Sequence, residues 1–176
     1  MRTILVMPIG HVDRETIDFI TGAIRETGEC DIIQGEPIPV PQKTFNARRS
    51  QYNSTRILKA LEGLKPDTYE RLLGVLDEDL YVPELNFVFG EADMIARVAV
   101  IGLPRLRQEF YGLEPDRALF LRRAAKEAVH ELGHLKGLGH CPVPRCIMHF
   151  SNSLAETDMK EAKFCAQCRN KLNELR

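Results

Sequence analysis

The sequence predicts an α+β fold with an α/β-like upper part, a long helix and a loop-rich lower part. Short apolar runs alternate with amphipathic stretches in the first half of the chain. A longer amphipathic stretch follows, and four of the five cysteines lie after it. With 176 residues, of which 44% are hydrophobic and 28% are charged, the chain is long enough to form one domain with a packed core.

Strands and helices are expected to alternate in the first part of the chain. In order, the expected segments are strand Thr3–Met7, helix Asp13–Thr27, strand Asp31–Ile33, helix Ser54–Leu64 and strand Arg71–Leu76. The helical segments repeat apolar residues every three or four positions, whereas the strand segments are short apolar runs. This order favours a parallel or mixed sheet with helices packed on it.

Two more strands and a long helix are expected next. The segments Asn86–Phe89 and Arg97–Gly102 are separated by a short connection, so at least one strand pair should be antiparallel. The long helix fits Asp116–Lys136, and Gly137 can adopt a left-handed conformation and end it. The face expected to pack on the core is a stripe of apolar residues three or four positions apart: Leu121, Ala125, Ala128, Leu132 and Leu135.

The remaining segment is loop-rich and is expected to end in a short helix at Ala166–Leu175. It contains Pro142 and Pro144 in addition to the cysteines. We therefore expect a single domain in which residues 1–137 form an upper subdomain with the long helix. Residues 138–176 are expected to form a lower subdomain.

Charge and hydropathy exclude two classes of partner. The net charge is -1 at pH 7, and no basic stretch is long enough to follow a phosphate backbone, so no nucleic-acid partner is expected. The first apolar run is too short for a secretory signal, and no window approaches the ~20 apolar residues of a membrane span. We therefore expect a soluble, cytoplasmic, monomeric protein with no membrane partner.

A run of H-E-L-G-H that starts at His130 carries the candidate chemistry. His130 and His134 are four residues apart on a helix, so their imidazoles lie one above the other, ~6 Å apart along the axis. Two such rings can bind one zinc ion, and the turn at Gly137 brings His140 back as a third ligand. Three protein ligands leave a fourth position open, which is typical of a catalytic zinc.

Glu131 lies beside the first histidine and is not needed as a ligand. Zinc lowers the pKa of a bound water to ~7, and a neighbouring carboxylate can accept its proton. The same carboxyl group can then deliver the proton to the leaving amine. These residues predict a zinc-dependent peptidase that acts on peptides or proteins, with Glu131 as general base. By chance, the eleven-residue pattern would occur on the order of once in 10⁴ to 10⁵ such chains, which disfavours incidental histidines on a solvated helix.

A second candidate metal site is formed by four cysteines: Cys141, Cys146, Cys165 and Cys168. Four thiolates make a closed tetrahedral zinc site, which is structural. Two alternatives stay open, because Cys165 and Cys168 alone could form a redox dithiol, and disulfides are possible in an exported protein. Cys30 is expected to be a small core residue. Because His140 and Cys141 are adjacent, the second zinc is expected to hold the third histidine in place.

The full pattern H-E-x-x-H-x-x-G-x-x-H, followed by a methionine-containing turn, resembles the metzincin zinc peptidases. The cysteine directly after the third histidine, C-x4-C-x-M and a later C-x-x-C make the chain similar to the archaemetzincins in particular. The resemblance implies a twisted, mixed five-stranded sheet whose antiparallel edge strand lines the cleft. It implies a second zinc on the four cysteines and the following roles: ligands His130, His134 and His140, base Glu131, and Met148 in the Met-turn beneath the catalytic zinc.

Further expectations concern the substrate and two competing functions. The substrate should bind as an extended strand along a sheet edge supplied by Asn86–Phe89 or Arg97–Gly102. His149 is expected to line the cleft or the surface. Two other functions stay open, namely a zinc-stabilised peptide-binding protein with little or no turnover, and a zinc store or sensor. Glu131 discriminates between them, since only hydrolysis needs a carboxylate beside the metal.

Overall fold

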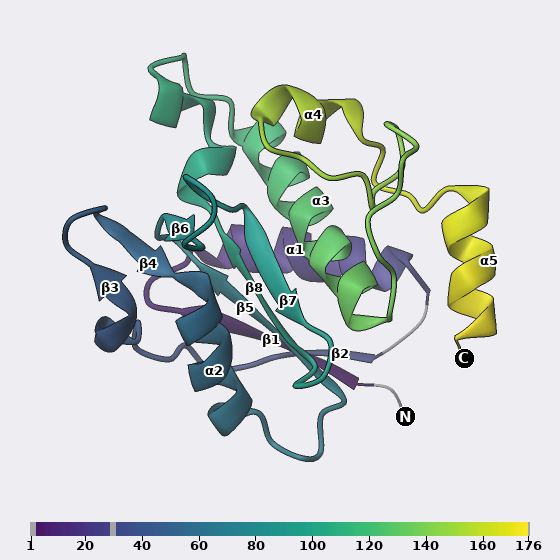
Figure 1. The fold of residues 1–176 in the computed structure, drawn as a ribbon, viewed down its shortest axis with the longest axis horizontal. Helices are drawn as coiled ribbons and strands as arrows, with labels where there is room; N and C mark the ends of the chain where they lie inside the picture. Colours follow the sequence, from purple (N-terminus) through teal and green to yellow (C-terminus); the bar gives the residue numbers. More distant parts are fainter. Residues whose placement is uncertain (1–2, 29–30, 176) are drawn as a thin grey trace.

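The computed structural model describes residues 3–28 and 31–175, and its centre is a five-stranded mixed sheet (Figure 1). The strands are β1 (Thr3–Ile9), β2 (Asp31–Gln34), β5 (Arg71–Leu76), β7 (Gly90–Asp93) and β8 (Val98–Gly102). Their spatial order is β2-β1-β5-β8-β7. Strand β7 runs antiparallel to β8, whereas the other pairs are parallel. The predicted mixed sheet with an antiparallel edge strand is confirmed.

Three helices cover the two faces of this sheet: α1 (Arg14–Glu26), α2 (Ser54–Leu64) and α3 (Arg117–Leu135). Successive side chains of a strand point to opposite faces. On β1 and β5, Val6 and Leu73 therefore pack in the buried cluster that contains α1 and α3, whereas Leu5 and Leu72 pack in the cluster that contains α2. All three helices form where the apolar periodicity predicts them.

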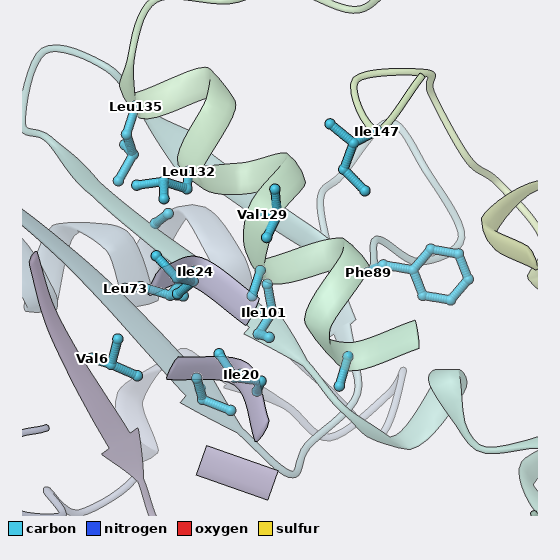
Figure 2. Packing of buried hydrophobic residues seen from close by; sticks show 14 of the residues in the cluster. Val6, Ile20, Ile24, Leu73, Phe89, Ile101, Val129, Leu132, Leu135 and Ile147 are labelled. Carbon is cyan, nitrogen blue, oxygen red and sulfur yellow. The ribbon is translucent and has the colours of Figure 1, made fainter. Parts of the chain in front are cut away.

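Helix α3 lies on the sheet through four of the five predicted stripe residues, namely Leu121, Ala128, Leu132 and Leu135. All five stripe residues are buried. Figure 2 shows Leu132 and Leu135 of α3 in the same cluster as Ile101 of β8. The helix begins after Asp116, whose side chain accepts a hydrogen bond from the N–H of Leu119 at 2.9 Å. This cap and the stripe fix both the start of the helix and the face that it buries.

The strand expected at Asn86–Phe89 is wrong, because the edge strand β7 begins at Gly90. The carbonyl of Asn86 accepts hydrogen bonds from the side chains of Arg49 and Gln51 at 3.1 and 2.9 Å. Asn86 is bound by these side chains and Val88 pairs with Leu80, so only Phe89 of the segment bonds to β8. The observed strand, Gly-Glu-Ala-Asp, has no run of apolar residues, since an edge strand needs less burial than an interior strand.

The strand expected at Arg97–Gly102 is present as β8, but it lies inside the sheet between β5 and β7. It therefore cannot supply a free edge, and that alternative is wrong. Arg97 itself belongs to the turn before the strand, with a φ of 58°. The free edge next to α3 belongs to β7.

Several short elements were not predicted. A small sheet consists of β3 (Phe45–Asn46), β4 (Gln51–Asn53) and β6 (Leu80–Tyr81). Short 3-10 turns lie at Gln42–Thr44, Pro104–Leu106 and Gln108–Tyr111, and helix α4 spans Leu154–Met159. These elements are too short for a periodic pattern to reveal them. Helix α5 (Ala166–Glu174) is the expected C-terminal helix.

The segment after α3 packs into the same core as the sheet. Cys146, Ile147 and Met148 belong to the buried cluster that contains Ile101 and the stripe of α3. The division into subdomains 1–137 and 138–176 stays a prediction, since hydrophobic contacts cross that boundary. The expectation for Cys30 falls outside the described residues.

No helix in the described ranges 3–28 and 31–175 is long and apolar enough to cross a membrane.

Candidate active site

One face of α3 presents four polar side chains to a cleft with a volume of about 240 Å³: Glu127, His130, Glu131 and His134. Residues three, four and seven positions apart share one side of a helix. Nδ1 of His130 lies 2.8 Å from the carbonyl oxygen of Ile147, and Nδ1 of His134 lies 2.8 Å from that of Leu138. A Nδ1–H that donates to a carbonyl leaves the lone pair on Nε2. The two Nε2 atoms are 3.1 Å apart, so they converge on one point.

His140 reaches the same point because α3 ends at a left-handed glycine. Gly137 has a φ of 93°. Its N–H donates to the carbonyl of His134 at 2.8 Å, and the next N–H reaches one residue further back, which is the Schellman pattern. The chain then returns beneath the helix. The His140 ring centroid lies 5.4 Å from that of His130 and 4.9 Å from that of His134.

The three imidazoles form a donor set that fits a zinc ion. One nitrogen from each ring lies within 4.8 Å of the others, and tetrahedral zinc with bonds of ~2.0–2.1 Å needs nitrogen atoms ~3.4 Å apart. Burial is the main cause that lowers the pKa of all three histidines. The rings are therefore neutral at pH 7, which is the state that binds metal.

Glu131 lies beside this donor set and against the edge strand. A Cβ atom on Gly90 would lie 2.6 Å from Oε1 of Glu131, so only glycine lets β7 approach this closely. Glu131 is 4% exposed, and no hydrogen bond joins its carboxylate to another described residue. Burial raises the pKa of Glu131 well above its usual range. The carboxylate of Glu127 adds to this, the charge of Lys160 opposes it, and Glu91 contributes less in the upward direction.

The free edge of β7 borders the cleft. The N–H of Gly102 donates to the carbonyl of Phe89 at 2.9 Å, and in the observed register residues 89, 91 and 93 direct their main-chain groups toward β8. The N–H and C=O groups of Gly90 and Ala92 therefore face outward. No hydrogen bond links these outward groups to the rest of the described chain. Such an edge can pair with an extended peptide.

Apolar side chains enclose the cleft. Phe87, Phe89 and Met94 come from the segments on either side of β7. Phe150 follows the Met148 turn, and its ring centroid lies 5.1 Å from that of His140. Sequence reasoning missed these side chains, because isolated aromatic residues form no periodic pattern.

The four cysteines of the last segment also converge. Sγ of Cys141 lies 3.8 Å from Sγ of Cys165, and Sγ of Cys146 lies 3.7 Å from Sγ of Cys168. A tetrahedron with zinc–sulfur bonds of ~2.3 Å has edges of ~3.8 Å, whereas a disulfide needs ~2.05 Å. The four thiols meet as one set, so a shared metal fits them better than an isolated dithiol. Burial opposes ionisation of Cys165, but the N–H of Cys168 and the other thiols lower its pKa to about 7.

Hydrogen bonds join Cys141 of the cysteine set to the Met148 turn. The N–H of Cys141 donates to the carbonyl of Met148 at 2.9 Å, and Nδ1 of His149 lies 2.9 Å from the carbonyl oxygen of Cys141. His149 is not a member of the three-histidine set. Met148 is fully buried, and a Cβ atom on Gly133 would lie 2.2 Å from its Sδ. The methionine therefore packs directly against the turn of α3 that carries the histidines.

Two ion pairs join the region around α4 to α3. Their four residues, here called the polar clasp, are Arg123, Glu127, Asp158 and Lys160. Arg123 binds both carboxylate oxygens of Asp158 at 2.7 and 2.6 Å. Nζ of Lys160 lies 2.9 Å from Oε1 of Glu127, and both side chains are buried. The hydroxyl of Thr157 gives Glu127 a second hydrogen bond at 3.3 Å. Breaking one partner of such a buried pair is costly, so the clasp fixes how α4 lies on α3.

Sequence reasoning missed the clasp and α4, although one local signal was available. Ser153 precedes Glu156 by three residues, as in a capping box. The Ser153 hydroxyl accepts from the N–H of Glu156 at 3.3 Å. The carboxylate of Glu156 in turn accepts from the N–H of Asn152 at 2.7 Å.

Comparison with known proteins decides the family. The model of Peptidase family M54 matches residues 7–174. The chain belongs to this family. It is 43% identical over 172 residues to an archaemetzincin of Methanocaldococcus jannaschii, a match that covers 97% of this chain and 93% of that protein.

Solved structures agree with this assignment. The crystal structure of an archaemetzincin from Methanopyrus kandleri matches with a TM-score of 0.85 and 37% identity, over 99% of this chain and 95% of that one. An archaemetzincin from Archaeoglobus fulgidus, complexed with malonate, matches with a TM-score of 0.83 and 36% identity, over 96% and 99%. This member of family M54 is a zinc metallopeptidase, and the resemblance and fold class predicted from its sequence are confirmed.

The contact between Gly133 and Met148 yields a prediction. In an ordinary helix position, Gly→Ala stabilises by about 1 kcal/mol. At Gly133 the new methyl group would collide with the buried thioether of Met148, and overpacking costs about 1–3 kcal/mol. We expect Gly133→Ala to lower the free energy of unfolding, measured by urea denaturation of the metal-loaded protein.

Gly22 in α1 is the matched control. A Cβ atom there meets nothing within 4 Å, so Gly22→Ala should leave the stability unchanged or raise it. In a Met148→Ala background, Gly133→Ala should lose most of its cost. A Gly133→Ala protein that is more stable than the parent would contradict this packing.

Proposed function

We propose that this zinc metallopeptidase hydrolyses peptide bonds with Glu131 as general base and acid, beside a zinc ion held by His130, His134 and His140. The convergence of the two Nε2 atoms, each fixed by a main-chain carbonyl behind its ring, carries this proposal. The fixed Nδ1 bonds favour the one tautomer that directs a lone pair into the cleft. A zinc ion at this point would polarise the scissile carbonyl and make a water molecule acidic.

The surroundings of Glu131 suit a carboxylate that moves a proton. Its oxygens have no hydrogen-bond partner in the described chain, so they are available to a water molecule. Burial raises its pKa above that of an exposed glutamate, so the carboxylate holds an accepted proton more readily, which favours its role as a base. Binding or storage of zinc requires neither property, so this environment supports hydrolysis over those alternatives.

The substrate backbone is proposed to pair with the free edge of β7. Gly90 and Ala92 each offer one N–H and one C=O group, and their spacing of two residues matches an antiparallel strand. Gly90 has no side chain and that of Ala92 is small, which leaves room for α3 beside the strand. Pairing through the main chain gives affinity with little dependence on sequence.

Replacement of Glu131 by glutamine tests the proposed base. Glu131→Gln keeps the shape of the side chain and all three imidazoles but cannot accept the proton. Hydrolysis of a peptide library should fall by about 100-fold or more, the usual contribution of a positioned general base. Elemental analysis should find the same zinc content in both proteins. Full activity of the variant would rule out this role for Glu131.

We further propose that a second zinc ion binds the four cysteines and holds His140 in position. The adjacency of His140 and Cys141 and the hydrogen bond from Cys141 to Met148 support this coupling. His140 lies in a loop beyond α3, and catalytic geometry tolerates only about 0.5 Å of error. The cysteine site can supply the rigidity that the loop lacks.

Loss of two distant cysteines should therefore weaken the histidine site. For Cys165→Ser with Cys168→Ser, we expect zinc affinity at the histidines to fall about 10- to 100-fold, typical of lost outer support. The measurement is a chelator competition on both proteins, with circular dichroism to show that each is folded. Equal affinities in two folded proteins would mean that the second site serves general stability alone.

A further inference from the structure

We propose that an extended substrate is recognised on both faces of the β7 edge, with alternate side chains entering the central cleft and a second groove beside α2. This inference rests on the proposed function, because it needs a peptide strand paired with β7. The second groove, here called the α2 groove, has a volume of about 910 Å³. Its lining includes Thr55, Arg56, Leu58, Lys59, Met94 and Ile95.

The cleft and the α2 groove meet at the edge strand. Glu91, Ala92 and Met94 border both. The carboxylate of Glu91 accepts hydrogen bonds from the hydroxyls of Ser54 and Thr55, at the start of α2. The side chain of Ala92 packs in the cluster that contains α3. The central cleft therefore lies on the α3 side of the edge and the groove on the α2 side.

A paired substrate would place its side chains alternately on these two sides. Opposite residues of an antiparallel pair have their side chains on the same face. Substrate residues opposite Gly90 and Ala92 thus face α3 and the cleft, and residues opposite Glu91 and Asp93 face the α2 groove. Gly90 is the β7 residue beside Glu131, and the strand continues from there away from the catalytic residues. A substrate strand antiparallel to β7 runs toward Glu131, so its residues over the groove precede the bond to be cleaved.

The composition of the groove selects a large apolar side chain. Ile95 is 96% exposed and Met94 is 56% exposed, although both are apolar. They form an apolar wall together with Leu58. Charged side chains line the rest of the groove, among them Arg56, Glu84 and Asp93, and Lys59 is paired with Glu62 at 2.6 Å. An apolar side chain that covers this wall removes surface from water on both partners.

Peptide hydroxamates test this alternation in binding. The probes are acetyl-tetraalanine hydroxamate and four relatives with one leucine at each successive position, because the hydroxamate fixes the register at the zinc. Zinc-loaded Glu131→Gln protein is titrated by calorimetry, so turnover plays no part. Leucine should improve the Kd about tenfold at positions over the α2 groove. Ile95→Gln, at a residue that lines the α2 groove and not the cleft, should remove most of that gain and spare the intervening positions.

The control is Leu113→Gln, at a residue that is 59% exposed and lines neither hollow; it should change no Kd. Circular dichroism confirms the fold of each variant. A leucine preference without alternation, or an equal loss at all four positions in the Ile95→Gln variant, would overturn the two-sided recognition alone. If none of the hydroxamates binds zinc-loaded protein, the proposed function fails and this inference fails with it.

Discussion

Helix α3 packs on the five-stranded sheet through a stripe from Leu121 to Leu135, and the geometry of the site depends on this contact. The stripe fixes the rotation of the helix about its axis. With that rotation set, Glu127, His130, Glu131 and His134 lie on the side that borders the cleft. The same contact brings β7 so close that the strand needs glycine at position 90. The hydrophobic contact between α3 and the sheet therefore positions these four polar side chains, which do not attract one another.

The segment after α3 completes the site from the other side. Ile147 supplies the carbonyl that orients His130, and Met148 packs against Gly133. The buried pair of Glu127 and Lys160 fastens α4 to the same helix. A buried ion pair contributes less to stability than to geometry, because the cost of desolvation offsets much of the attraction. The main effect of this pair is therefore to fix the arrangement of the two segments.

Sequence reasoning succeeded where one periodic pattern decides the structure. The stripe of α3, the left-handed Gly137 and the histidine spacing all follow from helix geometry, so their placement could be derived. The edge strand could not be placed, because Gly-Glu-Ala-Asp lacks a burial pattern and its partner contacts are remote in sequence. The pairing of Glu127 with Lys160 likewise depends on tertiary packing.

The cysteines occupy an intermediate position. Their spacing predicted four convergent thiols but left a dithiol and disulfides as alternatives. Only the distances between sulfur atoms, close to the edges of a tetrahedral zinc site, favour one of the three. The sequence predicts that the four cysteines act together. The choice among a zinc site, a redox dithiol and disulfides needs the distances that the fold supplies.

We propose that the two donor sets each hold one zinc ion, and zinc X-ray absorption with elemental analysis tests this most directly. The parent protein should contain two zinc ions per chain, with a mixed nitrogen and sulfur environment. His130→Ala with His134→Ala should retain one zinc ion surrounded by four sulfur atoms at ~2.3 Å. A single zinc ion in the fully loaded parent, or nitrogen ligands that persist after loss of both histidines, would contradict the account.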